Sequence, residues 1–202
     1  LPRLKGKYGS RGAGECPTGE NGYTGGLMFK GSYNPYPVFY LYHMDQYNSS
    51  YYGGWYYDKT GQYPTSRQDL HDKGIPRVYG DTIAWDVSMP SGRWYTVIER
   101  IVLNTPGKHD GIAEGFVDGK LVAQVTGLRF RTHPDHGINN IEFDSFFGGS
   151  GDEYGSPQNQ YIYFDDVIAY YYPAGSGVTA GNTPWTPGVP LPEVSFPSRP
   201  VY

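Results

Sequence analysis

Short apolar and aromatic stretches alternate residue by residue with polar positions along much of the chain, and clusters of Gly, Pro, Asn and Asp separate them. This two-residue period is typical of strands with one buried face, and no long window keeps the 3.6-residue period of an amphipathic helix. We therefore expect an all-β fold, a jelly-roll or concanavalin-like antiparallel sandwich with few or no helices. Nine strands are predicted, at residues 27–30, 38–44, 55–57, 83–87, 94–103, 111–117, 120–126, 138–147 and 161–172.

The connection between two of these strands is predicted in detail. The pair Asp118-Gly119 stands between Phe116-Val117 and Lys120-Leu121. Asp and Gly tolerate the positive φ angles that both central positions of a tight hairpin turn require. The sequence therefore predicts a two-residue β-hairpin at this point.

Three segments lack the strand alternation. Residues 1–24 are rich in Gly and basic residues, and we expect a surface loop there. Residues 57–80 form a long polar excursion, with a candidate helical turn at 66–72. After residue 172 the chain becomes rich in Pro and Gly, which favours either an extended tail wrapped on the domain or a disordered linker. The expected organisation is one domain at 1–172, followed by a tail at 173–202.

The composition narrows the classes of function. A formal net charge of −4 leaves no basic footprint for binding nucleic acid, and no apolar run is long enough for a membrane span. The aromatic, lysine-poor composition and the sequon Asn48-Ser49-Ser50 favour a secreted protein that is glycosylated at Asn48. The single cysteine, Cys16, is either a buried thiol or a residue whose disulfide partner lies outside the chain.

Two tyrosines on one predicted strand are the leading candidates for chemistry. Tyr40 and Tyr42 are two positions apart, so both hydroxyls project from one face, with Cα atoms about 6–7 Å apart. That spacing suits either adjacent sugar subsites or an acid/base pair. A tyrosine normally has a pKa near 10, so a catalytic base needs a nearby cation or hydrogen-bond donors, for which Lys30 and His43 are candidates. In a regular strand His43 points to the opposite face, and it would need a bulge to join the tyrosines.

Other clusters suggest further hypotheses. Tyr161 and Tyr163 share a strand face and suit either packing or stacking on a sugar ring. Asp144 and Asp165 are candidate ligands of a structural Ca²⁺, and paired carboxylates would also suit a glycosidase. The histidines of 133–136 are expected in a solvated loop rather than in a metal site. No serine-hydrolase elbow, phosphate loop or dinucleotide fingerprint occurs in the sequence.

A series of motifs occurs in a fixed order from the first residue to about residue 172. Its members are Leu1-Pro2-Arg3-Leu4, Tyr23-Thr24-Gly25-Gly26-Leu27-Met28-Phe29-Lys30, Tyr40-Leu41-Tyr42, Trp94-Tyr95-Thr96-Val97, Val102-Leu103-Asn104-Thr105-Pro106-Gly107, Asp118-Gly119-Lys120, Phe146-Phe147-Gly148-Gly149-Ser150 and Tyr161-Ile162-Tyr163-Phe164-Asp165-Asp166. The ordered set resembles the polysaccharide lyase jelly-roll group that contains the alginate lyases of family 14 and, more distantly, the glucuronan lyases of family 20.

The resemblance implies an enzyme that cleaves a uronate-containing polysaccharide by β-elimination. This reaction requires neutralisation of the C5 carboxylate, a base for the C5 proton and an acid for the leaving oxygen. It needs no cofactor, although family 20 implies a structural calcium. Within the resemblance, Thr24 corresponds to a family serine and Lys30 to an arginine that flanks the groove. The candidate catalytic residues are thus Tyr40, Tyr42 and His43, and the candidate substrate-binding residues are Lys30, Thr24, Tyr161 and Tyr163.

The chain departs from the family pattern in its cations. The family's catalytic lysine would stand immediately before Leu1, and Gly26 replaces the family's arginine. We therefore hypothesise that the chain is the distal part of a processed precursor, whose earlier segment supplies strands, the lysine and a thiol. Open sheet edges and Cys16 would then favour a companion chain or self-association. Two functional hypotheses follow: a secreted polysaccharide lyase, or a non-catalytic extracellular jelly roll that binds carbohydrate or assembles with itself.

Overall fold

The computed structural model describes residues 2–6, 16–30, 35–46, 53–54, 80–143, 155–156, 158–159 and 161–169. The chain divides into two compact units, 1–144 and 145–202, and each is considered by itself. The described part contains strands and no helix, so it has no helix with the length and apolar character of a membrane span.

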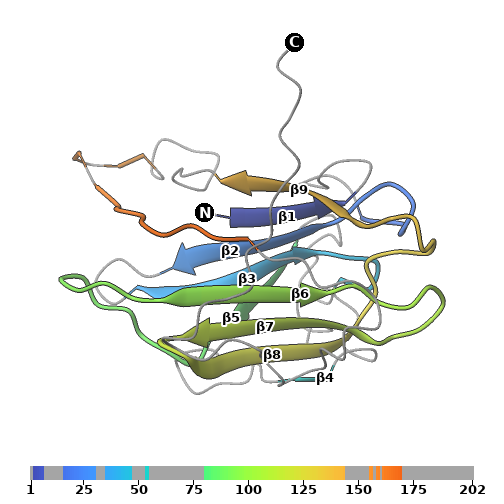
Figure 1. Ribbon diagram of the computed structural model, residues 1–202, viewed down its shortest axis with the longest axis horizontal. Coiled ribbons are helices and arrows are strands. Elements are labelled where there is room, and N and C mark those ends of the chain that lie inside the picture. Colours follow the sequence, from blue (N-terminus) through green and yellow to red (C-terminus); the bar gives the residue numbers. More distant parts are fainter. Residues whose placement is uncertain are drawn as a thin grey trace, which may run out of the picture. The chain divides into compact units, whose positions relative to one another are not determined.

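The first unit contains two antiparallel sheets (Figure 1). One has the strand order β5-β3-β2-β1-β9, and its members are β1 (Pro2–Gly6), β2 (Thr24–Lys30), β3 (Tyr36–Tyr42), β5 (Asp81–Ala84) and β9 (Ile138–Phe143). The other has the order β4-β8-β7-β6, and its members are β4 (Gly53–Gly54), β6 (Val97–Val102), β7 (Gly111–Val117) and β8 (Lys120–Leu128).

The hydrophobic core lies between these two sheets. Alternate residues of β2, β3 and β5 face it, including Leu27, Phe39 and Ile83, and β7 and β8 contribute residues such as Ala113 and Val125 from the other side. The predicted antiparallel sandwich is therefore confirmed, and its two-residue hydrophobic period reflects one buried face per strand.

The hairpin prediction is also confirmed. Val117 pairs with Lys120, and the two residues between them have φ angles of 49° at Asp118 and 80° at Gly119. Positive φ at both central positions matches the right-handed twist of the strands that the turn connects.

Three predictions about the strands need correction. Residues 2–6 were expected in a surface loop, but they form β1, which pairs with β2 on one side and β9 on the other. The strand predicted to begin at Trp94 begins at Val97, because Thr96 exchanges hydrogen bonds with Asp118 of the hairpin turn instead of joining the ladder. Residues 161–169 form no regular strand, since their backbone takes part in no ladder among the described residues.

Other predictions fall outside the described residues and remain predictions. They concern the strand at 55–57, the helical turn at 66–72, the domain boundary at 172, the tail at 173–202 and the glycosylation of Asn48.

Gly115 permits close packing between β7 and the core tryptophan. A Cβ atom at this position would lie 2.5 Å from ring atoms of Trp85, which is completely buried. We expect Gly115→Ala to lower the free energy of unfolding by about 1–3 kcal/mol because the rigid ring must shift. Urea denaturation would measure the loss, with Gly137→Ala as the control, since nothing lies within 4 Å of the added Cβ there. Equal stabilities of the two variants would contradict this account of the packing.

Glu99 on β6 is a carboxyl group on the core side of the sandwich. Its neighbours at alternate positions, Val97 and Ile101, both pack against the core. Its Oε1 atom is buried and has no hydrogen-bond partner among the residues that the structure describes. Burial disfavours the charged form, and it raises the pKa of Glu99 from 4.5 to about 8.

This raised pKa predicts a specific pH dependence of stability. Between pH 4.5 and about 8 the unfolded chain loses the Glu99 proton while the folded chain keeps it, so the free energy of unfolding falls as the pH rises through this window. Each unit of pKa difference corresponds to about 1.4 kcal/mol. In Glu99→Gln this contribution is absent, and the variant should become more stable relative to the parent from pH 4.5 to 8. Parallel stability profiles for the two proteins in chemical denaturation would refute the prediction.

Candidate active site

The tyrosine pair lies on the face of β3 that points away from the core. Phe39 and Leu41 are completely buried in the core, so the two-residue period turns Tyr40 and Tyr42 to the other face. Their hydroxyl oxygens are 3.0 Å apart, within hydrogen-bond distance, and their rings meet edge to face with centroids 5.2 Å apart. The two phenols therefore form one hydrogen-bonded unit rather than two separate subsites.

The strands on either side of β3 determine what surrounds the pair. Thr24 of β2 is the register partner of Tyr42, and Gly26 of β2 is the partner of Tyr40. On the other side, Thr82 of β5 is opposite Tyr40. Tyr42 is only 4% exposed, whereas Tyr40 is half-buried and Thr82 is exposed. The tyrosine pair is therefore reached from solvent at Tyr40.

Gly80 lets the chain pass close to the ring of Tyr42. A Cβ atom on Gly80 would lie 2.8 Å from Cε2 of Tyr42 and 3.1 Å from the carbonyl oxygen of Leu41. Any larger residue would displace the ring or the strand. The sequence pattern gave no sign of this role, because it depends on which segment packs on β3.

Lys30 lies farther along the same face of β2. It is opposite Tyr36 and four positions beyond Gly26, which corresponds to about 13 Å along the strand. Desolvation by neighbouring atoms lowers its pKa, although the residue keeps contact with solvent. Lys30 is therefore placed to meet a different part of an extended ligand from the part that meets Tyr40.

His43 points to the other side of β3, as the alternation of a regular strand predicts. Its Nε2 atom lies 2.6 Å from Oδ2 of Asp81, and both side chains are buried. The structure thus does not bring His43 together with the tyrosine hydroxyls. It places the residue in a buried pair that connects the end of β3 to the start of β5.

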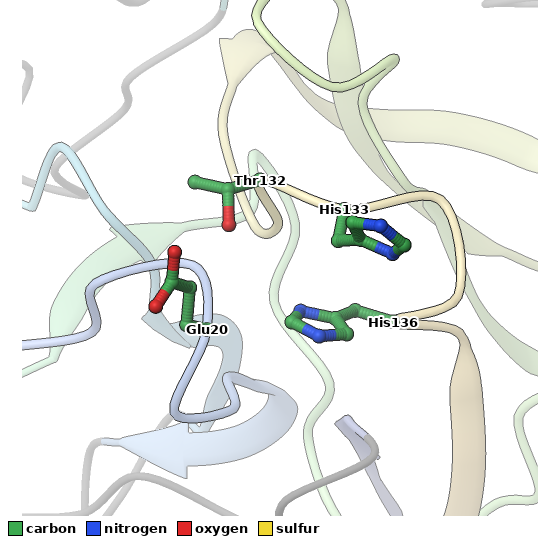
Figure 2. Close-up of a pocket in the computed structure, with 4 residues that line it drawn as sticks. All are labelled: Glu20, Thr132, His133 and His136. Carbon is green, nitrogen blue, oxygen red and sulfur yellow. The ribbon is translucent and has the colours of Figure 1, made fainter.

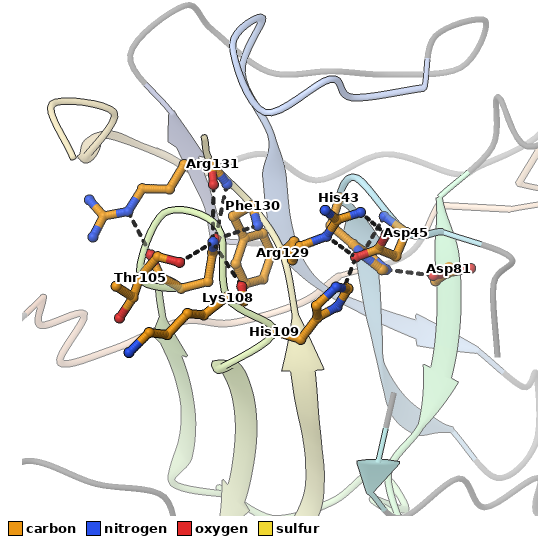
Figure 3. A network of polar contacts seen from close by, with 10 residues as sticks. His43, Asp45, Asp81, Thr105, Lys108, His109, Arg129, Phe130 and Arg131 are labelled. Carbon is orange, nitrogen blue, oxygen red and sulfur yellow. Dashed lines mark hydrogen bonds and ion pairs between the residues drawn. The ribbon is translucent and has the colours of Figure 1, made fainter. Parts of the chain in front are cut away.

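A second group of charges follows His43 at this end of the sandwich (Figure 3). Asp45 accepts hydrogen bonds from Arg129, one of them 2.7 Å from Nε, and lies 3.6 Å from Nδ1 of His109. The backbone N–H of Met44 donates to the carbonyl of Arg129 at 2.9 Å. These contacts connect the end of β3 to the segment that follows β8, so they hold the two sheets together next to the tyrosine strand.

Asn104 organises the two neighbouring loops, whose residues Thr105, Lys108, Phe130 and Arg131 are labelled in the same view (Figure 3). Its side-chain oxygen accepts from the backbone N–H groups of Phe130 (2.7 Å) and Arg131 (3.0 Å). Its amide nitrogen donates to the carbonyls of Thr105, Lys108 and Arg131. One completely buried amide thus satisfies backbone groups of two loops. This explains in structural terms why an asparagine follows β6.

An open hollow of about 390 Å³ lies elsewhere on the unit and is lined by Glu20, Thr132, His133 and His136 (Figure 2). Nδ1 of His136 lies 2.9 Å from the carbonyl oxygen of Gly19, and the two imidazole centroids are 5.7 Å apart. The histidines are in a loop, as predicted. No group of three or more His, Cys, Asp or Glu side chains suited to a metal ion occurs in the part of the chain that the structure describes.

The remaining predicted site residues belong to other regions. Tyr161, Tyr163 and Asp165 lie in the second unit, in a segment without regular strand structure, where Oδ1 of Asp165 accepts from the backbone of Asp166 at 2.9 Å. Asp144 lies outside the described residues. Cys16 is half-buried in the first unit. The roles predicted for these residues remain predictions.

Two basic residues were not recognised as candidates because they lie in the segment predicted to be a loop. In β1, Arg3 is the register partner of Gly26 and Lys5 is the partner of Thr24. The sequence contained one signal, the alternation of basic and apolar residues around Leu4, but five residues are too few to distinguish a strand from a loop.

Comparison with solved structures supports the fold. The chain is 24% identical to alginate lyase Aly36B, with a TM-score of 0.52, over 78% of this chain and 55% of that protein. It is 22% identical to the marine PL-14 alginate lyase from Aplysia kurodai, with a TM-score of 0.50, over 78% of this chain and 56% of that one. A variant of Aly36B solved in complex with alginate tetrasaccharide is 23% identical, with a TM-score of 0.52. The chain thus spans a little over half the length of these jelly-roll lyases.

Comparison with sequences identifies the family. No curated protein sequence matches the chain at a significant level. The family model described as Polysaccharide lyase 14 matches residues 37–167, which include the tyrosine pair, the hairpin and the Asn104 loop. Because this match covers well over half of the 202 residues, the chain belongs to the polysaccharide lyase 14 family.

Proposed function

We propose that the protein cleaves a uronate-containing polysaccharide by β-elimination, with Tyr40 as the residue that exchanges a proton with the sugar. The observation that carries the proposal is the hydrogen-bonded pair of phenols, with hydroxyls 3.0 Å apart, on a strand face open at Tyr40. Membership of a polysaccharide lyase family supports the reaction class.

The hydroxyls of Tyr40 and Tyr42 would have different roles in the reaction because the two residues differ in burial. Tyr42 is almost completely buried, so its hydroxyl is suited to donate a hydrogen bond to the oxygen of Tyr40. A donor of this kind would orient the hydroxyl oxygen of Tyr40 and stabilise negative charge on it during the proton transfer. Tyr40 is the catalytic residue, and Tyr42 is its positioning partner.

The reaction then proceeds with a balanced transfer of one proton. The Tyr40 phenolate takes the C5 proton of a uronate, and the electrons of that C–H bond form a double bond between C4 and C5. The C4–O bond breaks, and the leaving oxygen receives the proton from Tyr40, which returns to its starting state. No redox or nucleotide cofactor is required. His43 takes no part in the proton transfer, because its side chain lies on the buried face of β3.

The rest of the polymer would extend along the same face of β2 and β3. Lys30 lies about 13 Å along β2 from Gly26, the residue opposite Tyr40, and it would bind the carboxylate of a more distant sugar. Thr24 lies next to Tyr42 and would help to position its hydroxyl. Since the solved relatives include complexes with alginate tetrasaccharide and trisaccharide, alginate is the first substrate to test, and glucuronan is the second. Such a substrate is consistent with a secreted, glycosylated protein.

The activity itself can be tested directly. β-Elimination leaves an unsaturated uronyl end, which absorbs ultraviolet light, so we expect absorbance to increase when the protein is mixed with alginate or glucuronan. Absence of the signal on both polymers, together with retained binding to them, would replace the lyase with a carbohydrate-binding protein of the same fold.

Substitution of the two tyrosines should separate their roles. Tyr40→Phe removes the proton carrier, and we expect kcat to fall by about 100- to 10,000-fold. Tyr42→Phe removes only a hydrogen bond to a charged group, so kcat should fall by about 10- to 100-fold. Both values come from initial rates of the absorbance assay, with circular dichroism to check the fold.

Tyr95→Phe is the matched control, since its hydroxyl donates to the carbonyl of Pro90 in a loop of the other sheet. It should retain the parent activity. A fully active Tyr40→Phe variant would show that the chemistry takes place elsewhere.

A further inference from the structure

The direct neighbours of Tyr40 on the outer face of the first sheet differ in burial. On the β2 side its register partner is Gly26, which is buried. Along β3 the next residues on the same face are Val38 and Tyr42, which are 0% and 4% exposed. On the β5 side its register partner is Thr82, which is exposed. Among these described neighbours the solvent side is therefore that of Thr82, and a ligand reaches the phenol across β5.

We propose that Thr82 binds a secondary hydroxyl of the uronate from which Tyr40 removes the proton. This inference rests on the proposed function and identifies a residue that orients the reacting sugar by direct contact. Directly paired residues of antiparallel strands lie on the same face of a sheet, with Cβ atoms about 5 Å apart. Since Thr82 and Tyr40 are such a pair, a pyranose ring that meets the phenol from the β5 side also meets the threonine.

The lengths of the two side chains determine which part of the sugar each one meets. A tyrosine carries its hydroxyl beyond a six-membered ring, whereas the hydroxyl of a threonine is attached directly to Cβ and stays close to the sheet. A sugar whose C5 proton points at the hydroxyl of Tyr40 therefore turns the opposite edge of its ring toward Thr82. That edge carries the hydroxyls of C2 and C3, which are the expected partners of the threonine.

The chemistry of threonine suits these partners. Its hydroxyl both donates and accepts hydrogen bonds, as each secondary hydroxyl of a sugar does. A neutral hydroxyl does not compensate the charge of a carboxylate, so Thr82 is better matched to the C2 and C3 edge than to the substituent of C5. The site should therefore select uronates whose C2 and C3 hydroxyls are unsubstituted, because an ester at either position removes the donor and adds bulk.

The other threonine beside the tyrosine pair is placed differently. Thr24 of β2 is the register partner of Tyr42, and it is only 3% exposed. The protein itself encloses this residue, so it can support the hydroxyl of Tyr42 but does not meet the sugar. Of the two threonines, Thr82 is the one that combines exposure with a position directly opposite Tyr40.

Binding is measured by titration calorimetry in a Tyr40→Phe parent, which does not consume the ligand. The probes are alginate tetrasaccharide, glucuronate tetrasaccharide and the same compounds acetylated at C2 and C3. Adding Thr82→Val removes the hydroxyl but keeps the branched shape of the side chain, and it should weaken binding of at least one unmodified tetrasaccharide by about 3- to 10-fold. Thr82→Ser should restore most of this loss. The parent should bind the acetylated form of that tetrasaccharide more weakly than the unmodified form.

Turnover separates a contact with the sugar from a structural role. In protein with an intact Tyr40, Thr82→Val should raise KM by about 3- to 10-fold and leave kcat nearly unchanged. The sugar hydroxyl does not react, so its hydrogen bond is equally strong in the substrate and in the transition state. If Thr82 served only to hold the tyrosine in place, kcat would fall and KM would not rise.

A bulky residue tests the direction of approach. Thr82→Trp would fill the space in front of Tyr40 on the β5 side, and kcat/KM should fall by about 100-fold, the cost of displacing the reacting atoms by about 1 Å. The matched controls are Thr96→Val and Thr96→Trp, at an exposed threonine of the other sheet. The contacts of Thr96 with Asp118 use its backbone N–H and carbonyl, so both controls should keep the parent activity. Circular dichroism checks the fold of each variant.

The outcomes distinguish this inference from the proposed function. Unchanged binding and unchanged KM in a folded Thr82→Val variant, or equal binding of acetylated and unmodified tetrasaccharides by the parent, would overturn the role of Thr82 and leave the lyase proposal intact. Binding that depends on the Thr82 hydroxyl, in a protein that shows no elimination, would support the role of Thr82 and overturn the lyase proposal. Failure of the parent to bind any uronate tetrasaccharide would overturn the inference as well.

Discussion

The antiparallel register of β3 between β2 and β5 is the constraint on which the rest of the site depends. Successive side chains of a strand point to opposite faces. Because Phe39 and Leu41 face the core, Tyr40 and Tyr42 face outward. A slip by one residue would expose the core residues and bury the phenols, so the apolar side of the strand specifies the geometry of the polar side. The energy that orients the tyrosines thus comes from hydrophobic burial rather than from their own hydrogen bond.

Polar interactions at the end of the sandwich keep this strand in place. The buried pair of His43 and Asp81 connects β3 to β5, and Asp45 with Arg129 connects the end of β3 to the other sheet. Breaking any of these pairs would leave a buried polar or charged group without its partner, which costs more than the pair itself contributes. Such contacts therefore fix the position of the tyrosine strand more than they add to the net stability of the fold.

The sequence predicted those parts of the fold whose conformation depends on residues that are neighbours in the chain. The alternation of apolar residues identified the strands of the sandwich, and Asp118-Gly119 identified the hairpin, because the required positive φ angles depend on the turn residues themselves. The opposite orientations of Tyr42 and His43 followed from the same period. β1 was missed because its five residues become a strand only by pairing with β2 and β9, which are distant in the sequence. The roles of Gly80 and Asn104 were equally hidden, since each depends on a loop that tertiary packing brings close.

The pattern of small residues connects the fold to its chemistry. Gly115 makes room for Trp85 in the core, and Gly80 makes room for the ring of Tyr42. A glycine within a strand weakens the sheet through its conformational entropy, so it is expected where another group must approach closely. At Gly115 and at Gly80 the approaching group is an aromatic ring of the protein itself. At Gly80 the ring is that of Tyr42, whose hydroxyl lies 3.0 Å from the hydroxyl of Tyr40, so the close approach of this glycine to β3 also determines the surroundings of the tyrosine pair.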